Sequence, residues 1–141
     1  MFYGDSIQDT RDLFFISWSK YLQKQTLLPL EQQLVQVILD HPEYQEMMAQ
    51  KDLLQDHRYF PELGETNPFL HMGLHLAIRE QITTNRPEGI SPLFQSLVHK
   101  YQNALSVEHL MMEQLAECLW LAQKNSAMPD EQHYLERLRQ L

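Results

Sequence analysis

The sequence predicts an all-α, single-domain helical bundle of about four main helices with short extra helices. Apolar residues recur at helical spacing nearly everywhere, and strand-like alternation is absent. The chain has 141 residues, of which 43% are hydrophobic, so one domain over residues 1–141 can bury a substantial core. Four glycines and seven prolines mark boundaries between helices, without internal repeats or low-complexity segments.

Two long helices and one short helix are expected in the first half of the chain. The first spans about residues 6–25, with Asp5 or Ser6 as its cap. The second begins near Pro29 and ends near His41, because the next residue is a proline. A short helix over roughly residues 42–50 follows. The apolar faces of the two long helices consist of Ile7, Phe14, Trp18, Tyr21 and Leu22, and of Leu30, Leu34, Val37 and Ile38.

The middle of the chain begins with an ordered loop at residues 52–67, anchored by Tyr59 and Phe60. Asn67-Pro68 then starts a helix that runs to about Thr84, because Asn caps well and Pro suits the first helical position.

The last third of the chain repeats this start signal at Ser91-Pro92. From there the pattern stays helical to about Lys124, and it allows, without demanding, a break near Ser106. Pro129-Asp130 opens a last short helix that carries the apolar residues Tyr134, Leu135 and Leu138.

The charge balance argues against several classes of function. Eleven Lys+Arg face nineteen Asp+Glu, and the basic residues do not cluster, so neither nucleic acid nor an anionic membrane surface is an expected partner. The N-terminus lacks the pattern of a secretory signal, and the apolar runs are too short to span a membrane. We therefore expect a cytoplasmic protein with a reduced Cys118, and a protein partner or a homodimer remains open.

Seven histidines beside one cysteine mean that histidines and carboxylates must supply any metal or acid–base centre. When the helix from Asn67 is projected, His71 and His75 fall on its most apolar face, one turn apart. This face also carries Leu74, Ile78 and Ile82. Two buried imidazoles need partners, because buried polar groups without partners are costly.

Two further helices repeat this spacing of four residues. His109 projects inward with Glu113 one turn on, and His41 ends a helix with Gln45 four residues later. The predicted inward face around His109 contains Leu105, Met112, Ala116, Trp120 and Gln123. Helical bundles build internal metal sites in this way. Imidazole and carboxylate ligands suit Zn or Fe(II), with Ni or Mn as further choices.

A purely structural interpretation stays open for each histidine. His41 at a helix C-terminus is favourable on dipole grounds alone, and His109 with Glu113 forms a plausible hydrogen-bonded pair. His57, His99 and His133 are expected on the solvent side. Cys118 projects opposite His109 and is expected to be inert.

A long string, NPFLHMGLHLAIREQ over residues 67–81, is accompanied by HPEY at residues 41–44 and RPEGI at residues 86–90. With Met112-Glu113 and the later Trp120, it resembles a small proteobacterial family known as domain of unknown function number eighteen forty-one. That resemblance covers nearly the whole chain and implies bacterial family membership without a known activity.

The usual pattern of that family reads HPEYH, NPFLHxxxHLxxxEQ and HxxMEC. His41, His71, His75, His109 and Glu113 match it. Gln45 replaces a second His, which removes one good ligand of a dinuclear site, and Gln114 replaces a Cys, so a thiolate there is not essential unless Cys118 compensates. The architecture is similar to hemerythrin-like and metal-dependent bundle hydrolases by fold analogy only.

Our leading hypothesis is an internal mononuclear site for a divalent metal, with hydrolysis by a metal-bound water as the reaction and iron-based oxygen chemistry as the other open choice. His71, His75 and His109 would be ligands, with Glu113 as a fourth ligand or general base. His41 would support these ligands or replace one, and Gln123 would orient water.

The alternative hypothesis is a non-enzymatic interaction module. Its buried His, Glu and Gln side chains would form a structural hydrogen-bond network. A patch of Tyr59, Phe60, Met47 and Met48 would dock its partner.

Overall fold

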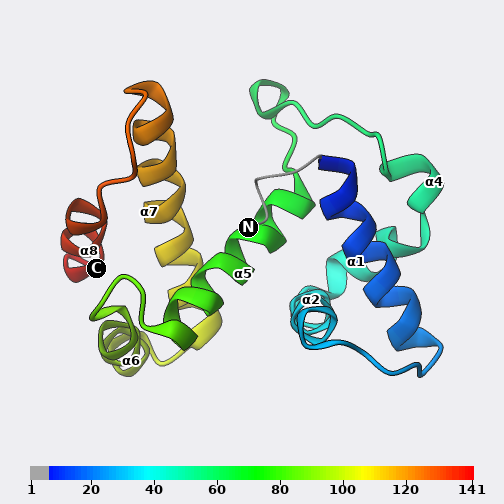
Figure 1. Ribbon diagram of the computed structural model, residues 1–141, viewed down its shortest axis with the longest axis horizontal. Coiled ribbons are helices and arrows are strands. Elements are labelled where there is room, and N and C mark those ends of the chain that lie inside the picture. The colour runs from blue at the N-terminus through cyan, green and yellow to red at the C-terminus, as the bar shows by residue number, and fades with distance from the viewer. Residues whose placement is uncertain (1–6) are drawn as a thin grey trace. The chain divides into compact units, whose positions relative to one another are not determined.

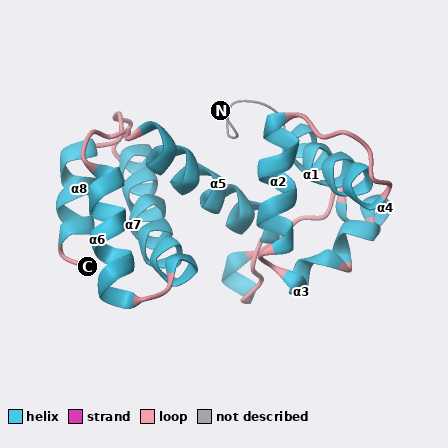
Figure 2. Ribbon diagram, turned by 90° about the horizontal axis from the view of Figure 1, so that it is seen from below, coloured by secondary structure: helices cyan, strands magenta, loops and turns pink. Residues whose placement is uncertain are grey.

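The chain is all-α, as predicted. The computed structural model describes the backbone of residues 7–141 and the side chains of residues 10–141. Figure 2 shows helices joined by loops, and the described residues contain no strand. They form two compact units, one that ends at Leu76 and one over Ala77–Leu141, and the boundary falls inside helix α5 (Pro68–Thr84). The assignment of residues 1–141 to a single domain stays a prediction.

The first unit is built around the packing of α1 (Ile7–Leu22) against α2 (Pro29–Leu39), drawn in blue in Figure 1. Short elements follow: α3 (Pro42–Gln45), the 3-10 helix η1 (Met47–Ala49), α4 (Lys51–Leu54) and the 3-10 helix η2 (Pro61–Leu63). The first turns of α5 close the core, which includes Phe14, Phe15, Trp18, Leu34, Ile38, Phe69 and Met72.

The predicted face of α1 was partly wrong. The last turn of α1 lies on the surface, where Leu22 is 62% exposed, because the helix ends there. Phe15, which was not among the predicted apolar residues, is buried. Leu30 at the start of α2 is also exposed, whereas Leu34, Val37 and Ile38 are buried as predicted. The predicted caps Asp5 and Ser6, and the side chain of Ile7, lie outside the described residues.

A buried arginine ties α1 to the segment after α4. Arg11 is almost fully buried, and its Nη1 donates hydrogen bonds to the carbonyl oxygens of Leu54 (2.8 Å) and His57 (2.6 Å). Its guanidinium also lies 4.9 Å from the ring centroid of Phe69 and 5.4 Å from that of Tyr59. These contacts hold part of the expected loop at residues 52–67 against α1. Tyr59, one of its two predicted anchors, is half-buried.

The second unit consists of the end of α5, α6 (Ile90–Tyr101), α7 (Ala104–Lys124) and α8 (Glu131–Arg139), in which α7 packs against both α6 and α8. Its core includes Ile78, Ile90, Leu97, Val107, Met111, Leu115, Tyr134, Leu135 and Leu138. The start of α8 is as predicted, because the side chain of Asp130 accepts the N–H of His133.

Two boundaries in this unit differ from the sequence prediction. Helix α6 begins at Ile90, directly after Gly89, whose positive φ of 100° suits glycine. The allowed break exists, but it lies before Ser106: Gln102 has φ 60°, and the side chain of Asn103 accepts the N–H of Ser106. A capping asparagine therefore restarts the helix. Within residues 7–141, no helix is both long and apolar enough to cross a membrane.

Candidate metal centre

Two histidines of the centre lie one turn apart on α5. The side chain of Asn67 accepts the backbone N–H groups of Phe69 and Leu70, which caps the helix as predicted and fixes where its turns begin. His75 is fully buried and His71 is half-buried. Their Nε2 atoms lie 3.2 Å apart, so the spacing of four residues does bring the two imidazoles together.

The third histidine comes from the corner between α2 and α3. His41 is buried and precedes Pro42, the first residue of α3. Its Nδ1 lies 2.8 Å from the carbonyl oxygen of Val37, and in that hydrogen bond Nδ1 donates. The neutral ring then carries its lone pair on Nε2, which is the atom that binds metals when Nδ1 is held in this way.

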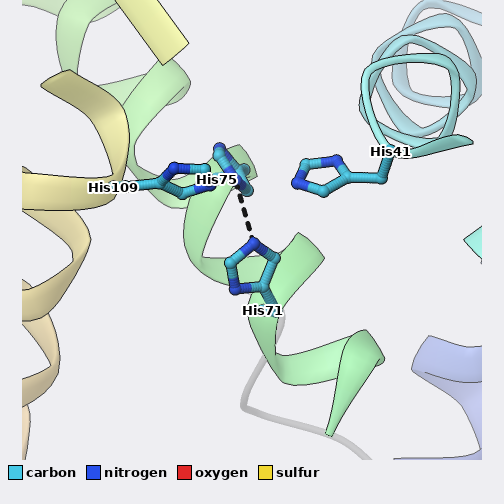
Figure 3. A group of neighbouring side chains, drawn as sticks. All are labelled: His41, His71, His75 and His109. Atoms are coloured by element: carbon cyan, nitrogen blue, oxygen red, sulfur yellow. Dashed lines mark hydrogen bonds between the residues drawn. The ribbon is translucent and has the colours of Figure 1, made fainter. Parts of the chain in front are cut away.

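These three side chains converge within the first unit. The ring centroid of His41 lies 5.1 Å from that of His71 and 4.6 Å from that of His75. Each residue offers one nitrogen, and the three nitrogens lie within 4.8 Å of one another. Figure 3 shows the His41 ring pointing toward the pair on α5. Segments far apart in the sequence thus supply three imidazoles to one place.

The spacing of the nitrogens suits a metal ion. On a tetrahedral zinc ion with Zn–N distances of about 2.0–2.1 Å, two nitrogen ligands lie about 3.3–3.4 Å apart. The Nε2 atoms of His71 and His75 are separated by nearly this distance. A small inward movement of His41 would complete three ligands, and three neutral imidazoles suit Zn or Fe(II) better than a hard cation.

The other predicted ligands lie on α7, in the second unit. His109 is on this helix with Glu113 one turn later, and Glu113 is exposed. The predicted inward face was wrong in part, because Trp120 is 56% exposed and Gln123 is also on the surface. Helix α7 instead buries the face that contains Val107, Met111, Leu115 and Cys118. The roles of His109 and Glu113 at a metal stay predictions from the sequence.

The remaining histidines and the cysteine agree with the sequence analysis. The side chains of His57, His99 and His133 are exposed. Cys118 is buried, and this burial raises the pKa of its thiol, which disfavours the reactive thiolate. None of these four residues belongs to the histidine cluster.

The docking patch of the alternative hypothesis is not formed as predicted. Met48 is 4% exposed and belongs to the core of the first unit, and Tyr59 packs against the same core. Only Phe60 of the aromatic pair is exposed. Of the four residues in the predicted patch, Met47, Met48 and Tyr59 therefore contribute to the core of the first unit, and Phe60 alone lies on the surface.

Sequence reasoning missed two polar features. One is Tyr44, whose ring stacks on that of His41; its position three residues after His41, within one helical turn, was the available signal. The other is the ion pair between Arg79 Nε and Glu108 Oε1, 3.0 Å apart, which joins α5 to α7 inside the second unit. Nothing in the local sequence pairs residues so far apart.

Comparison with known proteins identifies a family for this chain but no activity. The family model described as Domain of unknown function (DUF1841) matches residues 6–140. No curated protein and no solved structure matches the chain significantly.

Proposed function

We propose a metal-binding function for this chain, which belongs to the family described as Domain of unknown function (DUF1841). In this proposal His41, His71 and His75 hold one divalent ion, Zn or Fe(II) first, Ni or Mn second. The observation that carries it is the convergence of three imidazole nitrogens from two distant segments of one unit.

The chemistry that we propose is hydrolysis. Three protein ligands leave an open position, and a metal there lowers the pKa of a bound water toward neutrality. The hydrogen bond from His41 Nδ1 to Val37 orients that ligand, while the full burial of His75 keeps bulk water from its side of the site. The proposal also includes Glu113 as a general base and His109 as a further ligand, and these two roles rest on the sequence analysis alone.

Metal analysis of the untagged protein tests the binding proposal. We expect about one equivalent of Zn or Fe by ICP-MS in the wild type, because a folded three-histidine site binds metal tightly. His41→Ala and His71→Ala should lose it, whereas His99→Ala and His133→Ala should keep it, since those side chains are exposed and outside the cluster. Less than about 0.1 equivalent in the wild type, with no rise in melting temperature on adding Zn or Fe, would contradict the proposal.

A spectroscopic readout separates lost ligation from lost folding. Replacing the fully buried His75 by alanine leaves a cavity that destabilises the fold by itself. The melting temperatures of the variants in chelator would therefore report folding without metal, and the visible d–d absorption of the Co(II)-loaded variants would report ligation. A folded His71→Ala variant with an unchanged Co(II) spectrum would exclude His71 as a ligand.

Three further comparisons test the finer parts of the proposal. His109→Ala and Glu113→Gln, each alone, should change the Co(II) spectrum if these residues ligate the metal. Unchanged spectra would restrict the ligands to the first unit. Metal-dependent hydrolysis of activated ester and phosphoester substrates, lost in His71→Ala, would support the reaction class, and equal rates with and without metal would contradict it.

A further inference from the structure

We infer that Tyr44 is a positioning residue for the proposed metal ligands His41 and His71. This inference rests on the proposed metal-binding function and concerns a side chain that donates no ligand to it. Tyr44 contacts two of the three histidines, and both contacts are ring to ring.

The local backbone places the tyrosine over its histidine. His41 precedes the first turn of α3, and the backbone N–H of Tyr44 donates to the carbonyl oxygen of His41 at 2.9 Å. Because residues three apart face the same side of a turn, the two side chains meet. Their ring centroids lie 5.3 Å apart with an angle of 7° between the planes, which is a stacked arrangement.

The same tyrosine reaches the second ligand. Its ring centroid lies 6.1 Å from that of His71, at an interplanar angle of 79°. This edge contact is within the range of favourable aromatic pairs. Tyr44 therefore stacks on one proposed ligand and makes a T-shaped contact with another, and these contacts link α3 to α5.

Two contacts together hold the His41 ring. The Val37 carbonyl fixes Nδ1, and the Tyr44 ring restricts rotation of the imidazole out of its plane. The direction of Nε2 is then set before a metal arrives, so less side-chain freedom is lost on binding.

Paired substitutions test this role. Tyr44→Phe keeps the ring and should bind Co(II) or Zn within about 3-fold of the wild-type Kd, whereas Tyr44→Leu removes the ring and should weaken binding about 10-fold or more. Tyr59→Leu is the matched control: it is another half-buried tyrosine of the first unit, and it contacts the exposed His57 instead of the cluster. It should leave the Kd unchanged.

A second readout does not depend on metal. In the metal-free protein, NMR should show faster exchange of the His41 Nδ1 proton in Tyr44→Leu than in Tyr44→Phe or Tyr59→Leu. An equal Kd and equal exchange in Tyr44→Leu and wild type would overturn the inference. Faster exchange in a chain that binds no metal would retain the positioning of His41 and overturn the metal-binding proposal alone.

Discussion

His71 and His75 face each other on successive turns of α5 with their Nε2 atoms 3.2 Å apart. A hydrogen bond between these two atoms needs one N–H donor, so in the metal-free, hydrogen-bonded pair one of the two rings carries its proton on Nε2. A metal bound through both Nε2 atoms requires that proton to leave or to move to Nδ1. Metal and shared proton are therefore mutually exclusive at this pair.

Because a metal and the shared proton cannot both occupy the Nε2 atoms of this pair, metal binding should change the tautomer of one of the two histidines. In the metal-free protein, long-range ¹H–¹⁵N NMR should show one of the two rings protonated on Nε2. Addition of Zn should remove that signal and leave both rings protonated on Nδ1 only. The same tautomers before and after saturation with Zn would show that this pair does not ligate the ion.

Substitution of the cap of α5 should weaken metal binding as well as stability. Asn67→Ala removes the acceptor for two backbone N–H groups and should cost about 1 kcal/mol in the free energy of unfolding. The frayed first turn also carries His71, so the Kd for Zn should rise a few-fold. Asp130→Ala, which removes the cap of α8, is the control with a similar stability loss and an unchanged Kd. If Asn67→Ala and Asp130→Ala changed the Kd equally, the cap of α5 would have no specific effect on metal binding.

The ion pair between Arg79 and Glu108 should contribute to the stability of the second unit. The two side chains are 26% and 10% exposed, and Arg79 Nε lies 3.0 and 3.2 Å from the two carboxylate oxygens. Glu108→Gln leaves a largely buried guanidinium facing a neutral group and should cost about 2 kcal/mol in chemical denaturation.

The control for this pair is Glu117→Gln. Glu117 lies on α7, like Glu108, and pairs at 3.2 Å with Arg137 of α8, where both side chains are well exposed. Its loss should change the free energy of unfolding by less than about 0.5 kcal/mol. Similar losses for Glu108→Gln and Glu117→Gln would mean that burial adds nothing to the first pair.

Alkaline pH should destabilise the fold through Tyr134. Burial is the main cause that raises the pKa of this phenol, whose O–H donates to the side-chain oxygen of Gln81 at 2.7 Å. Because the folded pKa exceeds the unfolded value of about 10, the contribution of Tyr134 to stability is complete below pH 10 and is lost as the pH rises further. Urea unfolding between about pH 8 and 11 should therefore show a steeper alkaline loss in the wild type than in Tyr134→Phe. Parallel pH profiles would assign the alkaline loss to other groups.

Local signals in the sequence located most of the helices. Pro29, Asn67-Pro68 and Asp130 each mark an observed helix start, because a cap or a first-turn proline acts on neighbouring backbone atoms. The separation of α6 from α7 was harder to predict, since the left-handed Gln102 resembles no standard stop signal.

In helix α7 the apolar periodicity of the sequence did not predict which face is buried. Apolar residues occur on nearly all of its sides, so a projection around His109 could not choose the buried face. The face through Met111 and Leu115 is buried because α6 and α8 pack against α7, and Trp120 is left exposed.

For the candidate site, the spacing of His71 and His75 was enough to predict that they share one face of a helix, because residues four apart lie on one side of any α-helix. The positions of His41 beside them, and of Tyr44 against His41 and His71, depend on how the folded chain packs. Those contacts arise when the apolar faces of α1, α2 and α5 form one core, and this packing sets the distance between residues that no local signal connects.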